Sequence, residues 1–321
     1  MNLQNPKKFK MMIDQAHDVA INVLRPISRK YDKAEHAYPK ELDMLASLID
    51  GMNEGGEGIN AGAAGAGKRG DTDNEGIRNG TNMSTALGII EMCYGDTGLL
   101  LSMPRQGLGN SAIAAVANDE QLERFKGTWA AMAITEPGCG SDSAAIRTTA
   151  TKDGNDYILN GEKIFVTSGE RADSVVVWAT LDRKLGRAAI KSFVVPKDTP
   201  GMKVERLEHK LGIKASDTAV ISFIDCRVPA ENLLGNAEVD VAKGFAGVME
   251  TFDNTRPLVA AMAIGCAKAS LERIKEIFKD QLDPDYSTPY LHASNLAAQI
   301  YRMEAEWEAA RLLMFCLLYT S

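Results

Sequence analysis

The sequence lacks the features that mark membrane-spanning, secreted and nucleic-acid-binding proteins. It has no apolar run of the roughly 18 residues that a transmembrane helix requires. The N-terminus has no apolar stretch or cleavage site and carries Asp14 and Asp18, so neither a signal peptide nor a transit peptide is expected. The formal net charge of −7 weighs against nucleic acid or an anionic membrane as the main partner.

Clusters of metal ligands are also missing from the sequence. The five cysteines are scattered and form no C-x-x-C pair, which predicts neither a zinc motif nor disulfides and suits a reducing, cytoplasmic location. The four histidines are far apart and have no metal-binding spacing, so no metal is expected. His209 lies in the charged stretch Glu208-His209-Lys210 and is predicted to be exposed to solvent.

A complete motif for binding a nucleoside triphosphate is absent as well. Residues 62–68 match the beginning of a P-loop, but Arg69 follows where Ser or Thr would bind magnesium. Glycine makes up a third of residues 51–80, and no hydrophobic period occurs there. This segment is therefore predicted to be a long glycine-rich loop rather than a phosphate-binding site.

What the sequence does contain is a change of pattern at two points. At 321 residues the chain is long enough for two or three domains, and its 45% hydrophobic and 25% charged fractions are those of a globular protein. We predict an N-terminal α-helical domain over residues 1–128, a middle β-barrel domain over 129–240, and a C-terminal helical bundle over 241–321. This α+β order of helices, strands and helices argues against a doubly wound sheet.

Helical periods mark the first of these segments. Apolar residues at three- and four-residue steps from Phe9 to Ile27 predict an amphipathic helix that is interrupted at Pro26. Pro39, followed by a run of leucines, predicts a second and shorter helix. Helical composition returns over residues 83–92 and 110–118.

Short β segments follow from Trp129 onward. Strands are expected at residues 175–179, 192–195, 202–204 and 220–224. Residues 157–159 and 163–166 also read as strands, and Asn160-Gly161 between them predicts a hairpin with a type I′ turn.

Two long helices are expected after Val241. The second carries apolar residues in a strict alternation of four- and three-residue steps from Leu296 to Leu317, which is typical of nearly parallel helices in a bundle. Such a seam needs further helices, supplied by another chain or by residues after Ser321. Because no cap residue or polar tail follows Leu317, we expect the bundle to be incomplete through C-terminal truncation.

Two segments of the predicted barrel carry the features of a ligand site. Ile134-Thr135-Glu136-Pro137-Gly138-Cys139-Gly140-Ser141-Asp142 is a strand end followed by a Pro-Gly turn, whose glycines allow a ligand close to the backbone. Phe165-Val166-Thr167-Ser168-Gly169 is a second strand end, on which Phe165 and Thr167 are expected to share a face. Ser141 is not read as a hydrolase nucleophile, because the Gly-x-Ser-x-Gly pattern is absent.

These segments, together with LGIKASDTAVISFIDCRVPAENLLG at 211–235 and TFDNTRP at 251–257, resemble the acyl-CoA dehydrogenases in content, order and spacing. The resemblance implies a helical domain, a β-barrel and a four-helix bundle, with FAD between the barrel and the bundle. It further implies α,β-dehydrogenation of an acyl-CoA thioester, in which a carboxylate removes the α-proton and a hydride passes to flavin N5. Electrons would pass to an electron-transfer flavoprotein, and the full-length enzyme would form a homo-oligomer.

The resemblance also implies roles for individual residues. Thr135 and Thr167 would bond the flavin ring, Phe165 would pack against it, and Met132 and Ile134 would line its other side. Ser141 would face both FAD and CoA. Asp253 and Arg256 would contact the CoA moiety, whose phosphates suit arginine.

Two departures from the family pattern keep other functions open. Some relatives carry the catalytic glutamate where Thr255 stands and others carry it on a later segment of the bundle, so no residue is assigned as the base and the glutamate is expected beyond Ser321. The Arg-x-x-Phe-Gly motif, which reaches FAD across a subunit interface in relatives, is replaced by residues 281–285. An acyl-CoA oxidase and a non-catalytic flavin- or acyl-CoA-binding protein are the alternatives.

Overall fold

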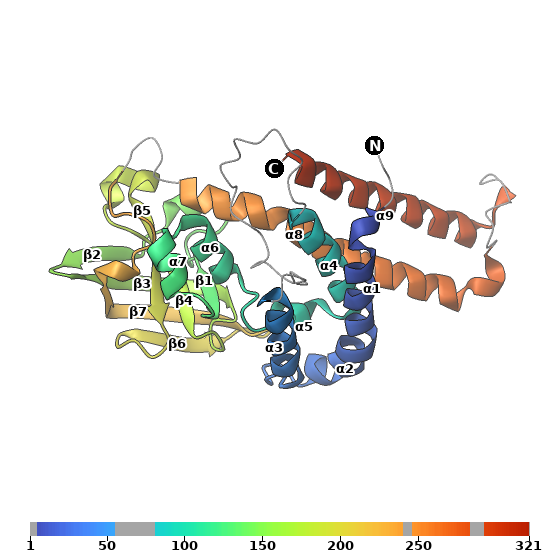
Figure 1. Ribbon diagram of the computed structural model, residues 1–321, viewed down its shortest axis with the longest axis horizontal. Coiled ribbons are helices and arrows are strands. Elements are labelled where there is room, and N and C mark those ends of the chain that lie inside the picture. Colours follow the sequence, from blue (N-terminus) through green and yellow to red (C-terminus); the bar gives the residue numbers. More distant parts are fainter. Residues whose placement is uncertain (1–4, 55–80, 240–245, 283–291, 321) are drawn as a thin grey trace.

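A computed structural model describes residues 5–54, 81–239, 246–282 and 292–320. A curled sheet occupies one end of the molecule and helices from both ends of the chain occupy the other (Figure 1). The long helix α8 (Ala246–Ile277) runs from the sheet to the helical part and so connects the two (Figure 1).

The N-terminal helices form because their apolar residues recur with a helical period. Helix α1 passes into α2 through a π-helical turn at Ala20–Leu24, and Pro26 lies in the first turn of α2. Because the helix is continuous there, the missing N–H of Pro26 interrupts the hydrogen-bond ladder directly after the π-helical turn, a usual place for such an irregularity. Their bounds, with the helices up to the sheet, are α1 Lys10–Val19, α2 Arg25–Lys33, α3 Glu41–Glu54, α4 Thr81–Gly95, α5 Thr97–Leu101, α6 Leu108–Val116 and α7 Asp119–Arg124.

One apolar core joins the first and last helices of the chain. It contains Leu24, Ile89 and Met92 from the N-terminal part, and Leu258, Ile264 and Met314 from α8 and α9 (Asn295–Thr320). Helix α9 lies alongside α8 (Figure 1), and the indole N–H of Trp307 donates to the carbonyl oxygen of Ile264 at 3.0 Å. The two long helices expected from the sequence are therefore confirmed.

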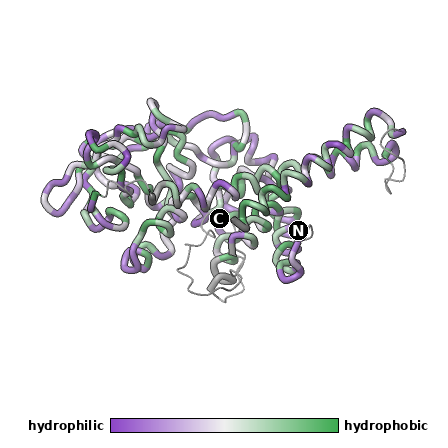
Figure 2. Tube along the Cα trace, turned by 90° about the horizontal axis from the view of Figure 1, so that it is seen from above, coloured by the Kyte–Doolittle hydropathy of each residue, from purple (hydrophilic) through white to green (hydrophobic). Residues whose placement is uncertain are grey.

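The predicted seam of α9 is only partly buried. Ile300 and Met314 are buried, whereas Met303 and Leu317 are 45% and 48% exposed. The end of α8 and the beginning of α9 extend beyond the other helices (Figure 2).

Seven strands form the sheet between residues 130 and 229. Its order is β1-β4-β2-β3-β7-β6, with β5 also paired to β4. The β1–β4 and β2–β4 pairs are parallel and the others antiparallel. The strands are β1 Ala130–Ala133, β2 Thr149–Asp153, β3 Asp156–Thr167, β4 Ser174–Thr180, β5 Ile190–Pro196, β6 Met202–Leu207 and β7 Thr218–Pro229.

The hairpin expected at Asn160-Gly161 is wrong. Strand β3 runs straight through both residues, with a register shift against β7 between Leu159 and Gly161. The Asn160 side chain bonds across to Asp225, donating to its carboxylate at 3.1 Å and accepting from its N–H at 2.8 Å. The actual turn joins β2 to β3 through Gly154, whose φ is +61°.

Most of the other secondary-structure predictions are confirmed, and the predicted loop at 51–80 is corrected at its start. The remaining predicted strands and the helices at 83–92 and 110–118 are confirmed, while β2 was not anticipated. The predicted loop 51–80 begins too early, because α3 continues to Glu54; its residues 55–80 lie outside the described part. The bounds of the three predicted domains stay predictions. Among the described residues, no helix combines the length and apolarity that crossing a membrane would require.

Candidate functional site

A buried ion pair holds the loop that follows β1. The ammonium of Lys163 on β3, which is 0% exposed, donates to Glu136 Oε1 at 2.7 Å and to the carbonyl oxygen of Ile134 at 3.0 Å. The Glu136 carboxylate also accepts from the N–H of Arg147 at 2.7 Å, and from the N–H and hydroxyl of Thr148 at 2.9 and 2.6 Å. The loop is thereby fixed to both β2 and β3.

The charges of this pair depend on each other. Burial opposes ionisation of Glu136, but the adjacent Lys163 ammonium and the hydrogen-bond donors outweigh it, so the pKa of Glu136 is lowered. Sequence reasoning noted Glu136 only as part of its motif and missed Lys163. Lys163 follows Asn160, Gly161 and Glu162 in a polar stretch of β3, so the local sequence carried no signal of a buried partner.

The same contacts bring the two sequence-predicted segments together. The N–H of Ile164 donates to the carbonyl oxygen of Thr135 at 2.9 Å, so Phe165 and Thr135 lie close along the backbone. Phe165 and Thr167 flank Val166, which is buried in the core of the sheet. Phe165 therefore points away from that core and is 60% exposed.

Phe165 has an unusual backbone. Its φ is +57°, in the left-handed region that non-glycine residues rarely adopt, and β3 changes register between Lys163 and Val166. An exposed aromatic ring and a strained backbone are each unfavourable in a strand, and such features occur together at ligand-binding sites.

Three hydroxyls of the sequence-predicted site have no partner among the described residues. The side chains of Thr135 and Thr167 are half-buried and that of Ser141 is exposed. Within the described part of the chain, none of the three hydroxyls has a hydrogen-bond partner. They are therefore available to the polar edge of a ligand.

An apolar cluster connects this region to the bundle. Ile134 is buried and Met132 half-buried in a cluster that also holds Ile113 of α6 and Phe252 of α8. The next residue, Asp253, forms an ion pair with Arg256 at 3.8 Å on the exposed side of α8. The sheet edge and the start of α8 are thus adjacent through Phe252, but no contact joins Ser141 to Asp253 or Arg256 among the described residues.

The space beside the Pro-Gly turn is open. A Cβ added to Gly138 or Gly140 would meet no protein atom within 4 Å. A cavity of about 250 Å³ adjoins the turn, lined by Glu136, Gly138 and Arg183 among others. A larger cavity of about 950 Å³ lies between α2, α4 and α8, and none of the sequence-predicted site residues lines it.

Comparison with known proteins gives the same picture as the motifs. The acyl-CoA dehydrogenase middle-domain family model matches residues 131–226, and the C-terminal-domain model matches 242–320. The short-chain-specific acyl-CoA dehydrogenase of Megasphaera elsdenii is 34% identical over 309 residues, covering 94% of this chain and 76% of that protein.

Solved structures agree with these matches. The structure of butyryl-CoA dehydrogenase from Megasphaera elsdenii is similar with a TM-score of 0.77 at 29% identity, covering 98% of this chain and 79% of that one. A chain from the structure described as the electron transferring flavoprotein of Acidaminococcus fermentans has a TM-score of 0.74 at 30% identity, with the same two coverages of 98% and 79%.

These matches place the protein in the class of FAD-dependent oxidoreductases that act on acyl-CoA thioesters. More narrowly, the chain belongs to the acyl-CoA dehydrogenase family. The family, the fold class, the enzyme class and the cofactor expected from the sequence are confirmed at this level. The donor set fits FAD, because an isoalloxazine ring needs an aromatic wall and a few aimed hydrogen bonds, which Phe165 and the free hydroxyls offer.

Proposed function

We propose that the protein catalyses α,β-dehydrogenation of a short saturated acyl-CoA and passes the electrons to an electron-transfer flavoprotein. The observation that carries this proposal is the meeting of the loop after β1 with the end of β3. There an exposed Phe165 lies beside Thr135 and Thr167, whose hydroxyls have no partner in the described part of the chain. The names of the two Megasphaera elsdenii relatives support a short acyl chain.

In this proposal each residue has a physical task. Bound FAD supplies the hydride acceptor. Phe165 covers one face of the flavin ring, Met132 and Ile134 form the wall opposite, and Thr135 and Thr167 fix its orientation. Ser141 contacts FAD and substrate, while Asp253 and Arg256 hold the CoA portion.

The base that takes the α-proton is not assigned to any described residue. Asp253 is paired with Arg256. Thr255 stands where some relatives have a catalytic glutamate, but it is buried and its hydroxyl donates to the carbonyl oxygen of Thr251 at 2.9 Å. A hydroxyl in that setting is a poor proton acceptor.

The decisive experiment is an anaerobic absorbance titration of the FAD-loaded protein with butyryl-CoA. We expect the flavin spectrum to bleach, with reoxidation by an electron-transfer flavoprotein. A spectrum that does not bleach would contradict dehydrogenation and favour a binding protein. Bleaching followed by rapid reoxidation in air with release of peroxide would instead identify an oxidase.

The placement of the cofactor has its own test. Phe165→Ala should weaken FAD binding roughly 3- to 10-fold, because aromatic stacking contributes about 0.5–1.5 kcal/mol. Ile224→Ala is a matched control, since Ile224 is a similarly exposed apolar residue on β7, 68% exposed. Equal FAD dissociation constants for the two variants, measured by fluorescence titration, would remove Phe165 from the site.

A further inference from the structure

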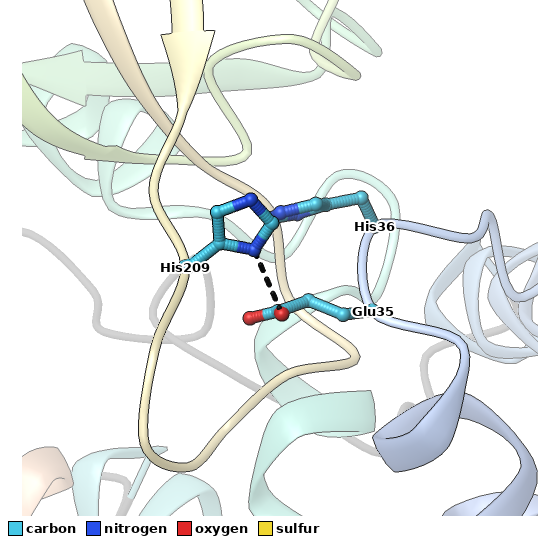
Figure 3. Close-up of side chains that lie close together, drawn as sticks. All are labelled: Glu35, His36 and His209. Atoms are coloured by element: carbon cyan, nitrogen blue, oxygen red, sulfur yellow. Dashed lines mark hydrogen bonds and ion pairs between the residues drawn. The ribbon is translucent and has the colours of Figure 1, made fainter.

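The fold brings together two histidines and a glutamate that are far apart in the sequence. Glu35 and His36 lie in the turn between α2 and α3, and His209 lies in the loop between β6 and β7. Glu35 and His209 are 174 positions apart. Figure 3 shows the three side chains gathered at one point between the helical part and the sheet.

The distances between their potential ligand atoms are close to those found in metal sites. His209 Nδ1 and Glu35 Oε2 are 3.0 Å apart, and one ligand atom from each of the three residues lies within 4.8 Å of the others. Nitrogen and oxygen ligands on a tetrahedral zinc ion are roughly 3.3 Å from each other. The side chain of His209 is 84% exposed and is held beside Glu35 by their hydrogen bond, so only a small movement of its ring is needed to reach this spacing.

His36 supplies an independent observation. Both of its ring nitrogens are buried, and neither has a hydrogen-bond partner in the described part of the chain. Buried polar atoms without a partner are rare in folded proteins and point to a missing ligand. Its ring centroid lies 5.1 Å from that of His209.

The backbone around His36 is held in a special conformation. Its φ is +68°, and its carbonyl oxygen and that of Ala37 accept hydrogen bonds from Arg171 at 3.3 and 3.0 Å. The ring is therefore presented by a fixed turn rather than by a loose segment.

The cluster contains one carboxylate, and three cations lie near it. Hydrogen bonds from His209 and from the N–H of Lys210 lower the pKa of Glu35 to about 2, so its carboxylate is anionic at neutral pH. The ammonium of Lys210 is directed elsewhere, to Ser216 and Thr218, and Arg171 is paired with Asp217. The charge of Lys214 also acts on the Glu35 carboxylate. Unlike Lys210 and Arg171, Lys214 has no other acceptor among the described residues.

We propose that Glu35, His36 and His209 form a binding site for a divalent transition-metal ion such as Zn²⁺. Two imidazoles and one carboxylate form a ligand set that suits zinc and leaves a fourth position for water, whereas Ca²⁺ and Mg²⁺ prefer oxygen ligands. The bound ion would join the turn before α3 to the loop before β7. The site shares no residue with the proposed flavin site.

The test is a titration of the full chain, freed of metal by a chelator, with Zn²⁺ in a calorimeter and with Co²⁺ as an absorbing probe. We expect one ion per chain and a Co²⁺ spectrum typical of tetrahedral coordination. His36→Ala, His209→Ala and Glu35→Gln should each weaken binding at least tenfold. His292→Ala, which removes an exposed histidine outside the cluster, should leave binding unchanged.

A fifth variant tests the electrostatics. Lys214→Gln should tighten Zn²⁺ binding by a few-fold, because it removes a positive charge that acts on the Glu35 carboxylate. Circular dichroism and FAD binding confirm that each variant is folded. The proposal would be overturned if the wild-type chain bound no stoichiometric ion. It would also be overturned if the folded His36→Ala and His209→Ala variants bound Zn²⁺ with the wild-type affinity.

Discussion

Lys163 and Glu136 illustrate how much a single buried charge can decide. Lys163 lies fully inside the sheet, and its pKa is lowered by that burial. The ammonium connects β3 to the loop that carries Thr135 and Ser141, so the pair positions residues of the proposed flavin site.

Replacing Lys163 by Met should lower the free energy of unfolding by about 3–5 kcal/mol at neutral pH, because Glu136 is then a buried charge without its partner. Urea denaturation would measure the loss. Lys203→Met is the control: Lys203 pairs with Glu205 on the surface, so its loss should cost under about 1 kcal/mol. Similar losses in both variants would show that burial of the Lys163 pair is unimportant.

The pH dependence of stability should differ between the wild type and Lys163→Met. In the wild type the pKa of Glu136 is lowered on folding, so its contribution is present above the unfolded value of 4.5 and is lost as the pH falls through the folded value. In Lys163→Met the effect of burial is opposed only by the hydrogen bonds from Arg147 and Thr148, so the pKa of Glu136 should be higher than in the wild type and the variant should gain less stability as the pH rises. The deficit should therefore shrink in acid; a deficit independent of pH would contradict this account.

At the scale of elements, β3 shows where local sequence preference gives way to tertiary contacts. Asn-Gly favours a two-residue turn, but here both residues lie inside a strand. Asn160 is used to bond Asp225 on β7, and Gly161 allows Thr148 to approach the strand closely. Both contacts are made by distant residues, so no local pattern could have indicated them.

Gly161→Ala should destabilise the protein by about 1–3 kcal/mol. A Cβ at this position would lie 2.3 Å from the hydroxyl oxygen and 2.8 Å from the Cα of Thr148, so backbone must move. Gly212→Ala is the matched control, since its Cβ would meet no atom within 4 Å. Thermal unfolding monitored by circular dichroism compares the two, and equal midpoints would count against the steric argument.

The helices were easier to predict than this strand. Their apolar periods extend over many residues, and a period of that length identifies the element whatever its partners are. Strand β2 escaped prediction because its outer part is exposed and polar, with the sequence Thr149-Ala150-Thr151-Lys152-Asp153, and it is recognisable only by its pairing with β3.

At the scale of the whole molecule, Arg171 joins segments from three parts of the chain. Its guanidinium donates to the carbonyl oxygens of Ala37 and Ala215 at 3.0 and 2.9 Å. It also donates to the hydroxyl of Ser102 and lies 3.3 Å from the buried carboxylate of Asp217. The turn before α3, the end of α5 and the loop before β7 therefore meet at one side chain.

Arg171→Gln should lower the free energy of unfolding by about 3 kcal/mol, because it leaves Asp217 buried without its counter-charge and releases the three backbone carbonyls of His36, Ala37 and Ala215. Arg227→Gln is the control, since Arg227 pairs with Asp153 and Asp156 at an exposed position. Denaturant unfolding of both variants gives the comparison. A loss in Arg171→Gln no greater than in the control would show that this junction contributes little.

The sequence by itself determined the longer helices, most of the strands and the two motifs at residues 134–142 and 165–169. These features are encoded by residues close together in the chain, through hydrophobic period and turn chemistry. Their similarity to the acyl-CoA dehydrogenases was visible for the same reason, and the assignment to that family is confirmed.

Only the tertiary structure decided which distant residues meet. It placed Lys163 on Glu136, set an exposed Phe165 beside the Thr135 backbone, and packed Phe252 of α8 against the cluster that holds Met132. It also brought His36 to His209, two histidines that the sequence indicated to be unrelated. Contacts of this kind depend on how sheet and helices pack, and spacing along the chain carries no record of that packing.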